Sequence, residues 1–247
     1  MQTSDASMKR KFNFVFYYAI ISTSVFLLFI LSSFVLKDKT LTADEITVKR
    51  IMVVGEDGTT PRVVISNETR QHSGRLDGKD MPPRQRDAGI IFFNNTGEEC
   101  GGLCFGVKKE DNTLYHGVYM TMDNYRNDQV IFIQNSETYR NGEREISRGI
   151  NINEYPAGAL PLGAAIEKLK QIDSIKDPKE KEAQFNAFIE KDGPRRRLFL
   201  GRTENNNNGL FLTDSNGHPK LDLYVDKNGN PRIDVIDSTG HRKNILH

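Results

Sequence analysis

The chain opens with one long apolar run and continues with short apolar segments separated by polar turns. Residues 12–36 form a run of 25 residues without a charged side chain. At ~1.5 Å per residue, a helix of that length reaches roughly 37 Å and crosses a ~30 Å hydrocarbon core with some tilt. A helix also satisfies its own backbone hydrogen bonds in lipid. Residues 12–36 are therefore predicted to be a transmembrane helix.

A cleaved signal peptide is the alternative interpretation of this run. The apolar region of a signal peptide usually spans ~7–15 residues and ends at a cleavage site with small residues in alternate positions. The run is longer, and its nearest imitation of such a site, Ser22-Thr23-Ser24, lies in its middle. We therefore expect an uncleaved signal anchor that crosses the lipid bilayer once.

Basic residues on both sides of the run set the expected orientation. Three of them directly precede the run and two directly follow it: Lys9, Arg10, Lys11, Lys37 and Lys39. The positive-inside rule therefore favours a cytoplasmic N-terminus by a small margin. We expect a single-pass protein of the cell membrane, with residues 1–11 as a short cytoplasmic tail, 37–48 as a connector and 49–247 as an exoplasmic domain.

Short segments rich in β-branched and aromatic residues predict that this domain is mainly β. Residues 49–54 and 62–66 flank Asp57-Gly58, which is typical of a hairpin turn. Further segments of this kind follow at residues 89–93, 101–106, 117–122, 129–133 and 149–153. Gly101 and Gly102 indicate a bulge or a close backbone approach. Residues 67–87 lack periodicity and are expected to be a long loop, either functional or a flexible insertion.

Residues 160–192 differ in kind, because their apolar positions recur at helical spacing. In the second half of this segment, Asp177 is placed as an N-cap, Pro178 at the first helical position and Glu180 three residues after the cap. Gly193 and Pro194 end the pattern. We predict two helices inserted into an otherwise β domain.

The C-terminal stretch repeats a short strand followed by an Asp-x-x-Gly turn. The turns begin at Asp214, Asp226 and Asp237, and their glycines lie 12 and 11 residues apart. The aspartate can accept backbone hydrogen bonds, and the glycine can adopt a left-handed conformation. Because such tight turns reverse the chain, the strands are predicted to pair as an antiparallel meander.

Alternation along these strands predicts which residues share a face of the meander. One face should carry aliphatic side chains from two neighbouring strands: Leu221, Leu223, Val225, Ile233 and Val235. Asp222 and Asp234 should point to the opposite side. We expect the aliphatic face to be the buried one, so that an aspartate in place of Leu223 unfolds the domain and an asparagine in place of Asp222 does not.

The fold class is therefore predicted as mainly β: an N-terminal transmembrane helix and an antiparallel β-meander domain with a two-helix insertion. The single span, the recurring Asp-x-x-Gly-x-Pro-Arg or -Lys units and a Gly-Glu-Glu-Cys-Gly-Gly-Leu segment at residues 97–103 resemble a family of uncharacterised membrane-anchored bacterial proteins. The resemblance covers most of the chain outside residues 67–87. Its motifs are structural turns, and it implies no particular activity.

The balance of charge gives no reason to expect a nucleic-acid partner. The chain holds 34 basic and 33 acidic residues, a formal net charge of +1. Binding to nucleic acid requires a basic face that displaces counterions from the phosphates.

Two carboxylates between residues 117–122 and 129–133 are the candidate catalytic pair. Asp123 and Asp128 flank Tyr125 and Arg126, and such a group could line a sugar-binding or hydrolytic site. A polar hairpin loop has the same composition and is the simpler interpretation. The sequence contains no Gly-x-Ser-x-Gly elbow, phosphate loop or dinucleotide fingerprint. No cofactor is expected.

The aspartate-rich turns and the five histidines do not predict a metal site. Asp226, Asn228 and Asn230 match the first oxygen ligands of a calcium loop, but Pro231 occupies the position that this loop reserves for glycine. Turn chemistry explains the same residues without a metal.

Cys100 and Cys104 are the only cysteines. Outside the cytoplasm an even number of cysteines favours a disulfide. In a straight strand, however, residues four apart are separated by ~13 Å, whereas bridged Cα atoms lie ~4.4–6.8 Å apart. Gly101-Gly102 could fold the segment enough to close this gap. A disulfide and a pair of buried or free thiols both stay open.

These observations favour a non-catalytic envelope protein whose β domain binds another protein or an envelope polymer. The alternative is a membrane-tethered hydrolase that acts on glycans through Asp123 and Asp128. A weaker third hypothesis is a sensor of pH or metal, whose short tail would need a signalling partner. The hypotheses differ in whether acidic side chains converge in a pocket with shifted pKa values or stand apart on solvated turns.

Overall fold

The computed structural model describes residues 2–35 and 41–246. The chain forms two compact units, residues 1–47 and residues 48–247. Residue 36 of the predicted span and residues 37–40 of the predicted connector lie outside the described residues, as do the two terminal residues.

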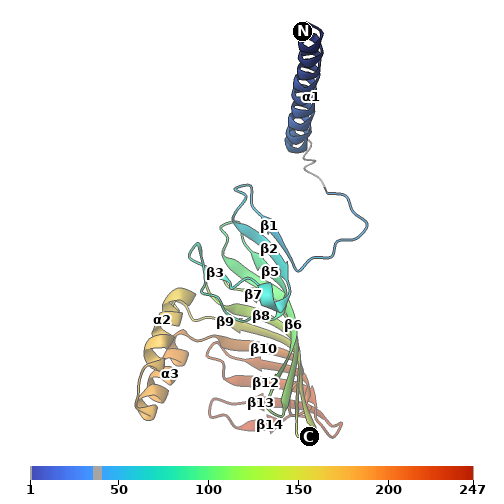
Figure 1. The fold of residues 1–247 in the computed structure, drawn as a ribbon. Coiled ribbons are helices and arrows are strands. Elements are labelled where there is room, and N and C mark those ends of the chain that lie inside the picture. The colour runs from blue at the N-terminus through green and yellow to red at the C-terminus, as the bar shows by residue number, and fades with distance from the viewer. Residues whose placement is uncertain (1, 36–40, 247) are drawn as a thin grey trace. The chain divides into compact units, whose positions relative to one another are not determined.

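The described part of the first unit contains one long helix, α1 (Gln2–Val35), drawn in blue in Figure 1. Its segment Met8–Ser32 is long and apolar enough to cross a membrane or to serve as a signal sequence. The predicted helix is confirmed, and it extends back through most of the predicted tail.

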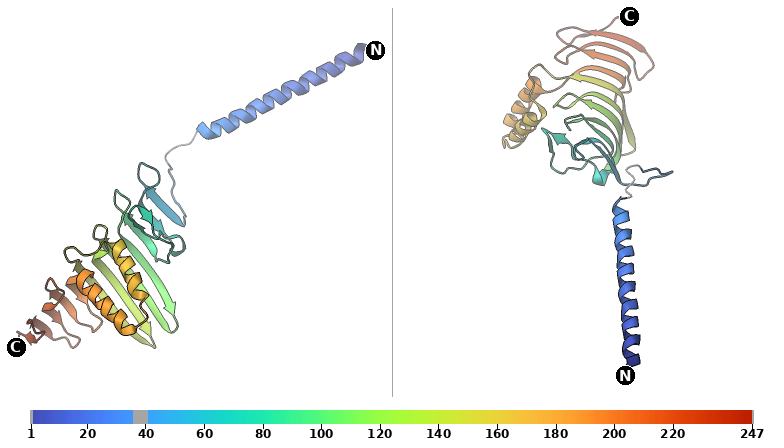
Figure 2. Two further views of the ribbon diagram at one scale, coloured as in Figure 1. Left: turned by 90° about the vertical axis from the view of Figure 1, so that its left-hand side faces the viewer. Right: turned by 90° about the horizontal axis from the view of Figure 1, so that it is seen from above.

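The second unit is built on one twelve-stranded antiparallel sheet (Figures 1 and 2). The strands of this sheet lie side by side in the order in which they occur along the chain. The predicted meander with a two-helix insertion is confirmed. In spatial order the strands are β1 (Arg50–Val54), β2 (Pro61–Ser66), β5 (Ala88–Phe93), β6 (Glu99–Glu110), β7 (Thr113–Asp123), β8 (Gln129–Arg140), β9 (Glu143–Glu154), β10 (Arg195–Arg202), β11 (Asn208–Thr213), β12 (Pro219–Val225), β13 (Pro231–Ile236) and β14 (Arg242–Asn244).

Two helices, α2 (Leu162–Asp173) and α3 (Pro178–Asp192), are inserted between β9 and β10 and lie on one side of the sheet (Figure 2). The predicted cap of α3 is confirmed, because the Asp177 carboxylate accepts hydrogen bonds from the backbone N–H groups of Lys179 and Glu180, each at 2.9 Å. The cap satisfies two of the N–H groups that a helix start leaves without a partner.

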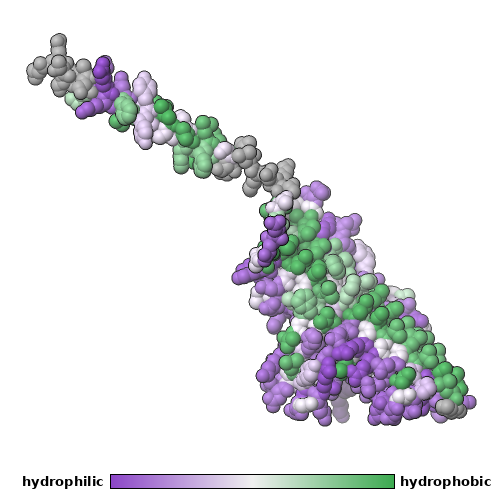
Figure 3. Space-filling view, turned by 90° about the vertical axis from the view of Figure 1, so that its right-hand side faces the viewer, coloured by the Kyte–Doolittle hydropathy of each residue, from purple (hydrophilic) through white to green (hydrophobic). Residues whose placement is uncertain are grey.

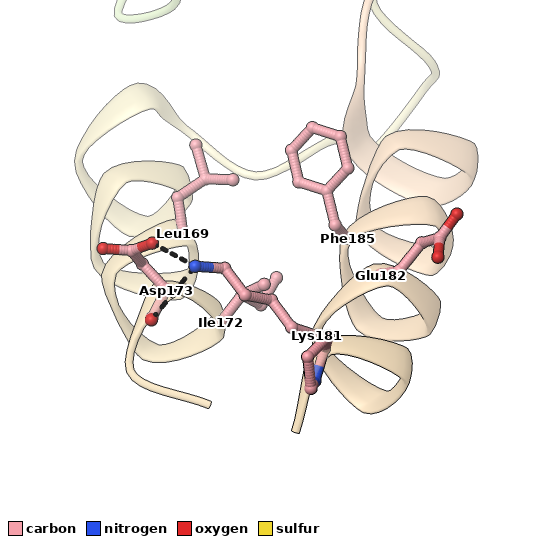
Figure 4. Close-up of a pocket in the computed structure, with 7 residues that line it drawn as sticks. Leu169, Ile172, Asp173, Lys181, Glu182 and Phe185 are labelled. Atoms are coloured by element: carbon pink, nitrogen blue, oxygen red, sulfur yellow. Dashed lines mark hydrogen bonds and ion pairs between the residues drawn. The ribbon is translucent and has the colours of Figure 1, made fainter. Parts of the chain in front are cut away.

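The two helices flank an open apolar pocket of about 510 Å³ (Figure 4). Leu169 and Ile172 of α2 face Phe185 of α3 across it. At one end the Nζ atom of Lys181 lies 2.5 Å from a carboxylate oxygen of Asp173, which ties α3 to α2.

The turns between the C-terminal strands form as the Asp-x-x-Gly pattern predicts. One carboxylate oxygen of Asp226 accepts hydrogen bonds from the backbone N–H groups of Asn228 and Asn230, both at 2.9 Å, and Gly229 has φ +85°. The hydrogen bond from Asn230, and to a smaller extent that from Asn228, lower the pKa of the Asp226 carboxyl. The aspartate oxygens are therefore engaged by the turn itself, and the described residues hold no cluster of three metal-ligating side chains.

The sheet has two unlike faces, called here the helix face and the open face. On the helix face Val64, Ile91, Phe93 and Cys104 form a buried cluster, against which Tyr119 packs. The open face carries a row of aliphatic side chains that are paired across neighbouring strands. Each strand of the main sheet except β14 contributes one: Ile51, Ile65, Ile90, Leu103, Met120, Ile133, Ile150, Leu200, Leu210, Leu223 and Ile233.

The predicted register of the C-terminal meander is confirmed, whereas the predicted buried side is wrong. Leu223 pairs with Ile233, and Asp222 pairs with Asp234 on the other face. Leu223 is 48% exposed, but Asp222 and Asp234 are 5% and 0% exposed. The reason is that the described part of the chain supplies no second layer over the open face, whereas Arg242 and neighbouring side chains cover the two aspartates.

Candidate functional site

A polar cavity of about 840 Å³ lies where β6 and β7 meet the loop of residues 67–87 and helix α2. Charged side chains from β6, β7 and the loop line it, and Leu162, Ile166 and Leu169 of α2 contribute an apolar wall. A concave site with convergent polar groups is the usual form of a ligand-binding pocket. It is therefore the strongest candidate site in the described part of the chain.

The loop of residues 67–87 has a defined structure and forms one wall of this cavity. It contains a short 3₁₀ helix, η1 (Glu68–Arg70), and a small hairpin of β3 (Arg75–Leu76) and β4 (Lys79–Asp80). The buried carboxylate of Glu98 fixes the turn of this hairpin by accepting hydrogen bonds from the N–H groups of Asp77 and Gly78, at 2.9 and 2.8 Å. The loop therefore has a defined conformation and contributes one wall of the cavity, and whether it is functional stays a hypothesis.

A close approach of β6 and β7 positions the floor of the cavity. Gly101 has φ +131°, and a Cβ atom placed there would lie 2.2 Å from the carbonyl oxygen of Thr121. Only glycine permits this contact, as the sequence predicted. Because Gly101 pairs with Met122, the start of β6 at Glu99 lies beside the end of β7 at Asp123.

An ion pair and a hydrogen bond hold the charged lining in place. Arg86 binds Glu99 through both nitrogens, with Nη1–Oε2 and Nη2–Oε1 distances of 2.9 and 2.7 Å, and both side chains are 17% exposed. The Tyr119 hydroxyl donates to a carboxylate oxygen of Asp87 at 3.0 Å. Burial, and then this contact, raise the pKa of Tyr119. The tyrosine therefore stays protonated as a donor.

Asp123 differs from these groups because the nearby Arg86 guanidinium, whose charge acts to lower the pKa of its carboxyl, is bound to Glu99. Its Oδ1 atom is buried without a hydrogen-bond partner among the described residues. Burial, and then the negative charges of Glu99 and Asp128, raise the pKa of its carboxyl to about 7. Near neutral pH much of Asp123 is therefore a neutral acid that can donate a proton or a hydrogen bond.

Asp128 lies at the exposed rim of the site, where one of its carboxylate oxygens accepts a hydrogen bond from the N–H of Gln129 at 2.9 Å. Tyr155 lies near both aspartates. Burial, and then the charges of Asp128 and Asp123, raise the pKa of its hydroxyl to about 12. The structure thus brings the two candidate residues of the sequence to one cavity. Sequence reasoning missed Glu99, Arg86 and Tyr155, although the Glu-Glu pair before Cys100 was a usable signal for Glu99.

The pKa of Asp123 predicts a specific dependence of stability on pH. In an unfolded chain an aspartate titrates near pH ~3.9, whereas in the fold Asp123 titrates near 7. Between these values the folded chain holds a proton that the unfolded chain has lost. The contribution of Asp123 to stability is therefore fully present below pH ~4 and is lost as the pH rises through about 7.

We expect Asp123→Asn to remove this contribution. Unfolding of the full chain in urea, followed at pH 5 and pH 8, should show a smaller fall in unfolding free energy for the variant than for the wild type. Equal falls for both chains would contradict the raised pKa.

The two cysteines lie on β6 as free thiols. Cys104 is buried in the helix-face cluster, and Cys100 lies next to the cavity residue Glu99. Burial raises the pKa of both thiols, and in the case of Cys100 the charges of Asp123 and Glu99 follow as further causes. Thiols with raised pKa values are weak nucleophiles near neutral pH.

A second charged cluster lies on the helix face of β12 and β13. Asp234 accepts a hydrogen bond from the Tyr224 hydroxyl at 3.0 Å and forms ion pairs with Arg232 and Arg242 at 3.2 and 3.5 Å. Arg242 also binds Asp222. Each carboxylate has a cationic partner, so this cluster is a closed network that holds the three last strands together.

No protein-family model, no curated protein and no solved structure matches the chain.

Proposed function

We propose that this protein is a membrane-anchored envelope protein whose β domain binds a polar ligand in the cavity between β6, β7 and the loop of residues 67–87. The observation that carries the proposal is the Oδ1 atom of Asp123, which is buried in the cavity lining without a hydrogen-bond partner in the described chain. A buried polar atom without a partner costs free energy, and a ligand that supplies the missing hydrogen bond recovers it.

The lining supports a ligand rich in hydroxyl groups, such as an envelope glycan. Asp123, with its pKa of about 7, can donate to a hydroxyl oxygen as well as accept from one. Arg86 and Glu99 satisfy each other and so give the site a rigid polar wall without net charge. Leu162 and Ile166 of α2 supply an apolar surface on which the C–H face of a sugar ring can pack.

The location of the domain is part of the proposal. A helix of membrane-spanning length, preceded by a compact basic cluster, supports a signal anchor with the β domain on the exoplasmic side. The resemblance to membrane-anchored bacterial proteins agrees with this placement. We expect protease added to intact spheroplasts to digest the β domain. Digestion only after lysis would reverse the orientation.

A hydrolase that acts on glycans is the second candidate, favoured by the shifted pKa of Asp123. A carboxylic acid that stays protonated near pH 7 is suited to protonate a leaving group. Asp128, at the exposed rim of the same cavity, is the available second carboxylate. In this hypothesis Asp123 is the general acid, and Asp128 activates water or attacks the sugar.

One experiment separates the two functions. The full chain in detergent is incubated with a panel of soluble envelope glycans, and both binding and release of new reducing ends are measured. The binding function predicts saturable binding without turnover and a change of less than about tenfold in affinity for Asp123→Asn, because an amide preserves one hydrogen bond. The hydrolase predicts turnover that Asp123→Asn lowers by ~100-fold or more.

Asp111→Asn is the matched control. Asp111 is an exposed residue in the turn between β6 and β7, and its φ of +48° is a conformation that asparagine tolerates. Binding and turnover should be unchanged in this variant. Absence of both binding and turnover for every glycan in the wild-type chain would contradict the proposed ligand class.

A further inference from the structure

The open face of the sheet is an extended apolar surface. Its aliphatic row runs from Ile51 in β1 through Met120 in β7 and Leu200 in β10 to Ile233 in β13, each residue paired with the next across the strands. Figure 3 looks onto this side of the domain and shows a continuous band of hydrophobic residues along it.

A second row runs beside the first, two residues along each strand. It pairs Val53 with Val63 at one end of the sheet and Leu221 with Val235 at the other. Between these two ends, every residue of the second row except Gly101 has an apolar side chain. Neither row contains a charged residue. The exposed side chains therefore form a band and are not scattered singly, which is the arrangement that marks interaction surfaces.

We propose that a second copy of this chain covers the open face, so that two sheets pack face to face in a homodimer. A sheet with one apolar face needs a second layer to bury it, and the described chain places its helices on the other side. Two apolar sheet faces pack with their strand directions within about 30° of each other and interdigitate their side chains. An uncharged aliphatic band is complementary to itself, as a two-fold interface requires.

The size of the band is close to what a stable dimer needs. Eleven strands spaced by ~4.8 Å span roughly 48 Å, and two rows cover roughly 13 Å along each strand, so the band occupies roughly 600 Å² of sheet. Protruding side chains add accessible surface to this flat area. Specific interfaces bury about 800 Å² per partner, and homodimer interfaces are more apolar than the rest of the surface.

The surroundings of the band have the character of an interface rim. Beside the band, on the long central strands, the carboxylate of Glu137 forms ion pairs with Arg144 and Arg148. The Nη2–Oε2 and Nη2–Oε1 distances are 2.6 and 2.7 Å. The hydroxyl of Tyr139, and then the two arginines, lower the pKa of Glu137. Arg202 pairs with Arg148 across β9 and β10. A charged border beside an apolar centre fits the usual anatomy of a protein–protein interface, in which a polar rim adjoins an apolar core.

The test uses the full chain in phosphatidylcholine vesicles with the photoreactive residue benzoylphenylalanine in place of Leu223. Leu223 is half exposed at the band, so the probe fits without a change in the core. Irradiation should give a covalent product of twice the 28.0 kDa chain mass. The same probe in place of Tyr125, which is 70% exposed in a turn outside the band, should give little of this product.

A charge in the band should abolish the contact. Leu200 is 49% exposed, so we expect Leu200→Glu to leave the fold of the single chain intact, as circular dichroism can confirm. The variant should lower the yield of the crosslinked dimer about tenfold or more, because a dimer would bury the new charge between two apolar faces. Leu200→Ser is the milder second variant should the charge reduce folding.

Three outcomes would overturn the dimer. The probe at position 223 could crosslink only to phospholipid, which would make the open face a lipid-binding surface. It could give no product of twice the chain mass. The yield could also be unchanged by both Leu200→Glu and Leu200→Ser, which would place the contact elsewhere on the molecule.

Discussion

Replacing Asp234 with alanine is expected to destabilise the domain by about 3 kcal/mol, as measured by urea unfolding. The side chain is fully buried, and it binds Arg232, Arg242 and the hydroxyl of Tyr224. Its removal leaves the partly buried hydroxyl of Tyr224 without its acceptor and leaves two cations competing for Asp222. The arginine side chains are 37% and 46% exposed, so water compensates part of the loss and the expected cost lies at the low end for a buried ion pair.

Glu145→Ala is the control for this prediction. Glu145 is an exposed acidic residue near the start of β9, so its removal deletes a negative charge without opening a buried network. The unfolding free energy of this variant should stay within about 0.5 kcal/mol of the wild-type value. Equal effects of the two substitutions would mean that the Asp234 network does not stabilise the last strands.

Replacing Gly101 with alanine is expected to cost about 3 kcal/mol and to disturb the polar cavity as well. The new Cβ atom would meet the carbonyl oxygen of Thr121 at 2.2 Å, and φ of +131° is strained for any residue with a side chain. The pairing of β6 with β7 must therefore open next to Asp123. Thermal unfolding measures the stability, and the pH dependence of stability reports on Asp123.

Gly117→Ala tests whether the effect belongs to the close approach. Gly117 lies on β7, the strand that pairs with β6, and a Cβ atom there would meet only the ring of Tyr119 at 3.7 Å, an ordinary contact. We expect this variant to differ from the wild type by less than about 1 kcal/mol. A loss equal to that of Gly101→Ala would show that glycine matters on these two strands only for its backbone freedom.

The strands and turns could be predicted from the sequence because local chemistry determines them. The carboxylate of Asp226 and φ of Gly229 close the turn whatever the surroundings, and the same holds for the cap that Asp177 provides for α3. Since each tight turn reverses the chain, the meander and its register followed from these local features.

The buried side of the sheet could not be predicted, because burial depends on partners distant in the sequence. The alternation Leu-Asp-Leu identified two faces correctly, but hydrophobicity alone selected the wrong one as the core. Asp234 is buried because Arg242 lies beside it on the folded sheet. The cavity could not be predicted for the same reason. Its ion pair between Arg86 and Glu99 forms only after the loop of residues 67–87 has folded back onto the sheet.

The meander has a consequence for the way the domain folds. Every neighbour in the main sheet follows closely in the sequence, except where the loop of residues 67–87 and the two helices intervene. Short loops cost little closure entropy, and such a topology resembles a one-dimensional array in which each strand adds to the edge left by the last. As the chain emerges from its N-terminal end, each new strand finds its template already formed. Folding can thus keep pace with synthesis. Among the described residues β14 is an edge strand of the sheet, and a short, basic edge strand disfavours pairing with another chain.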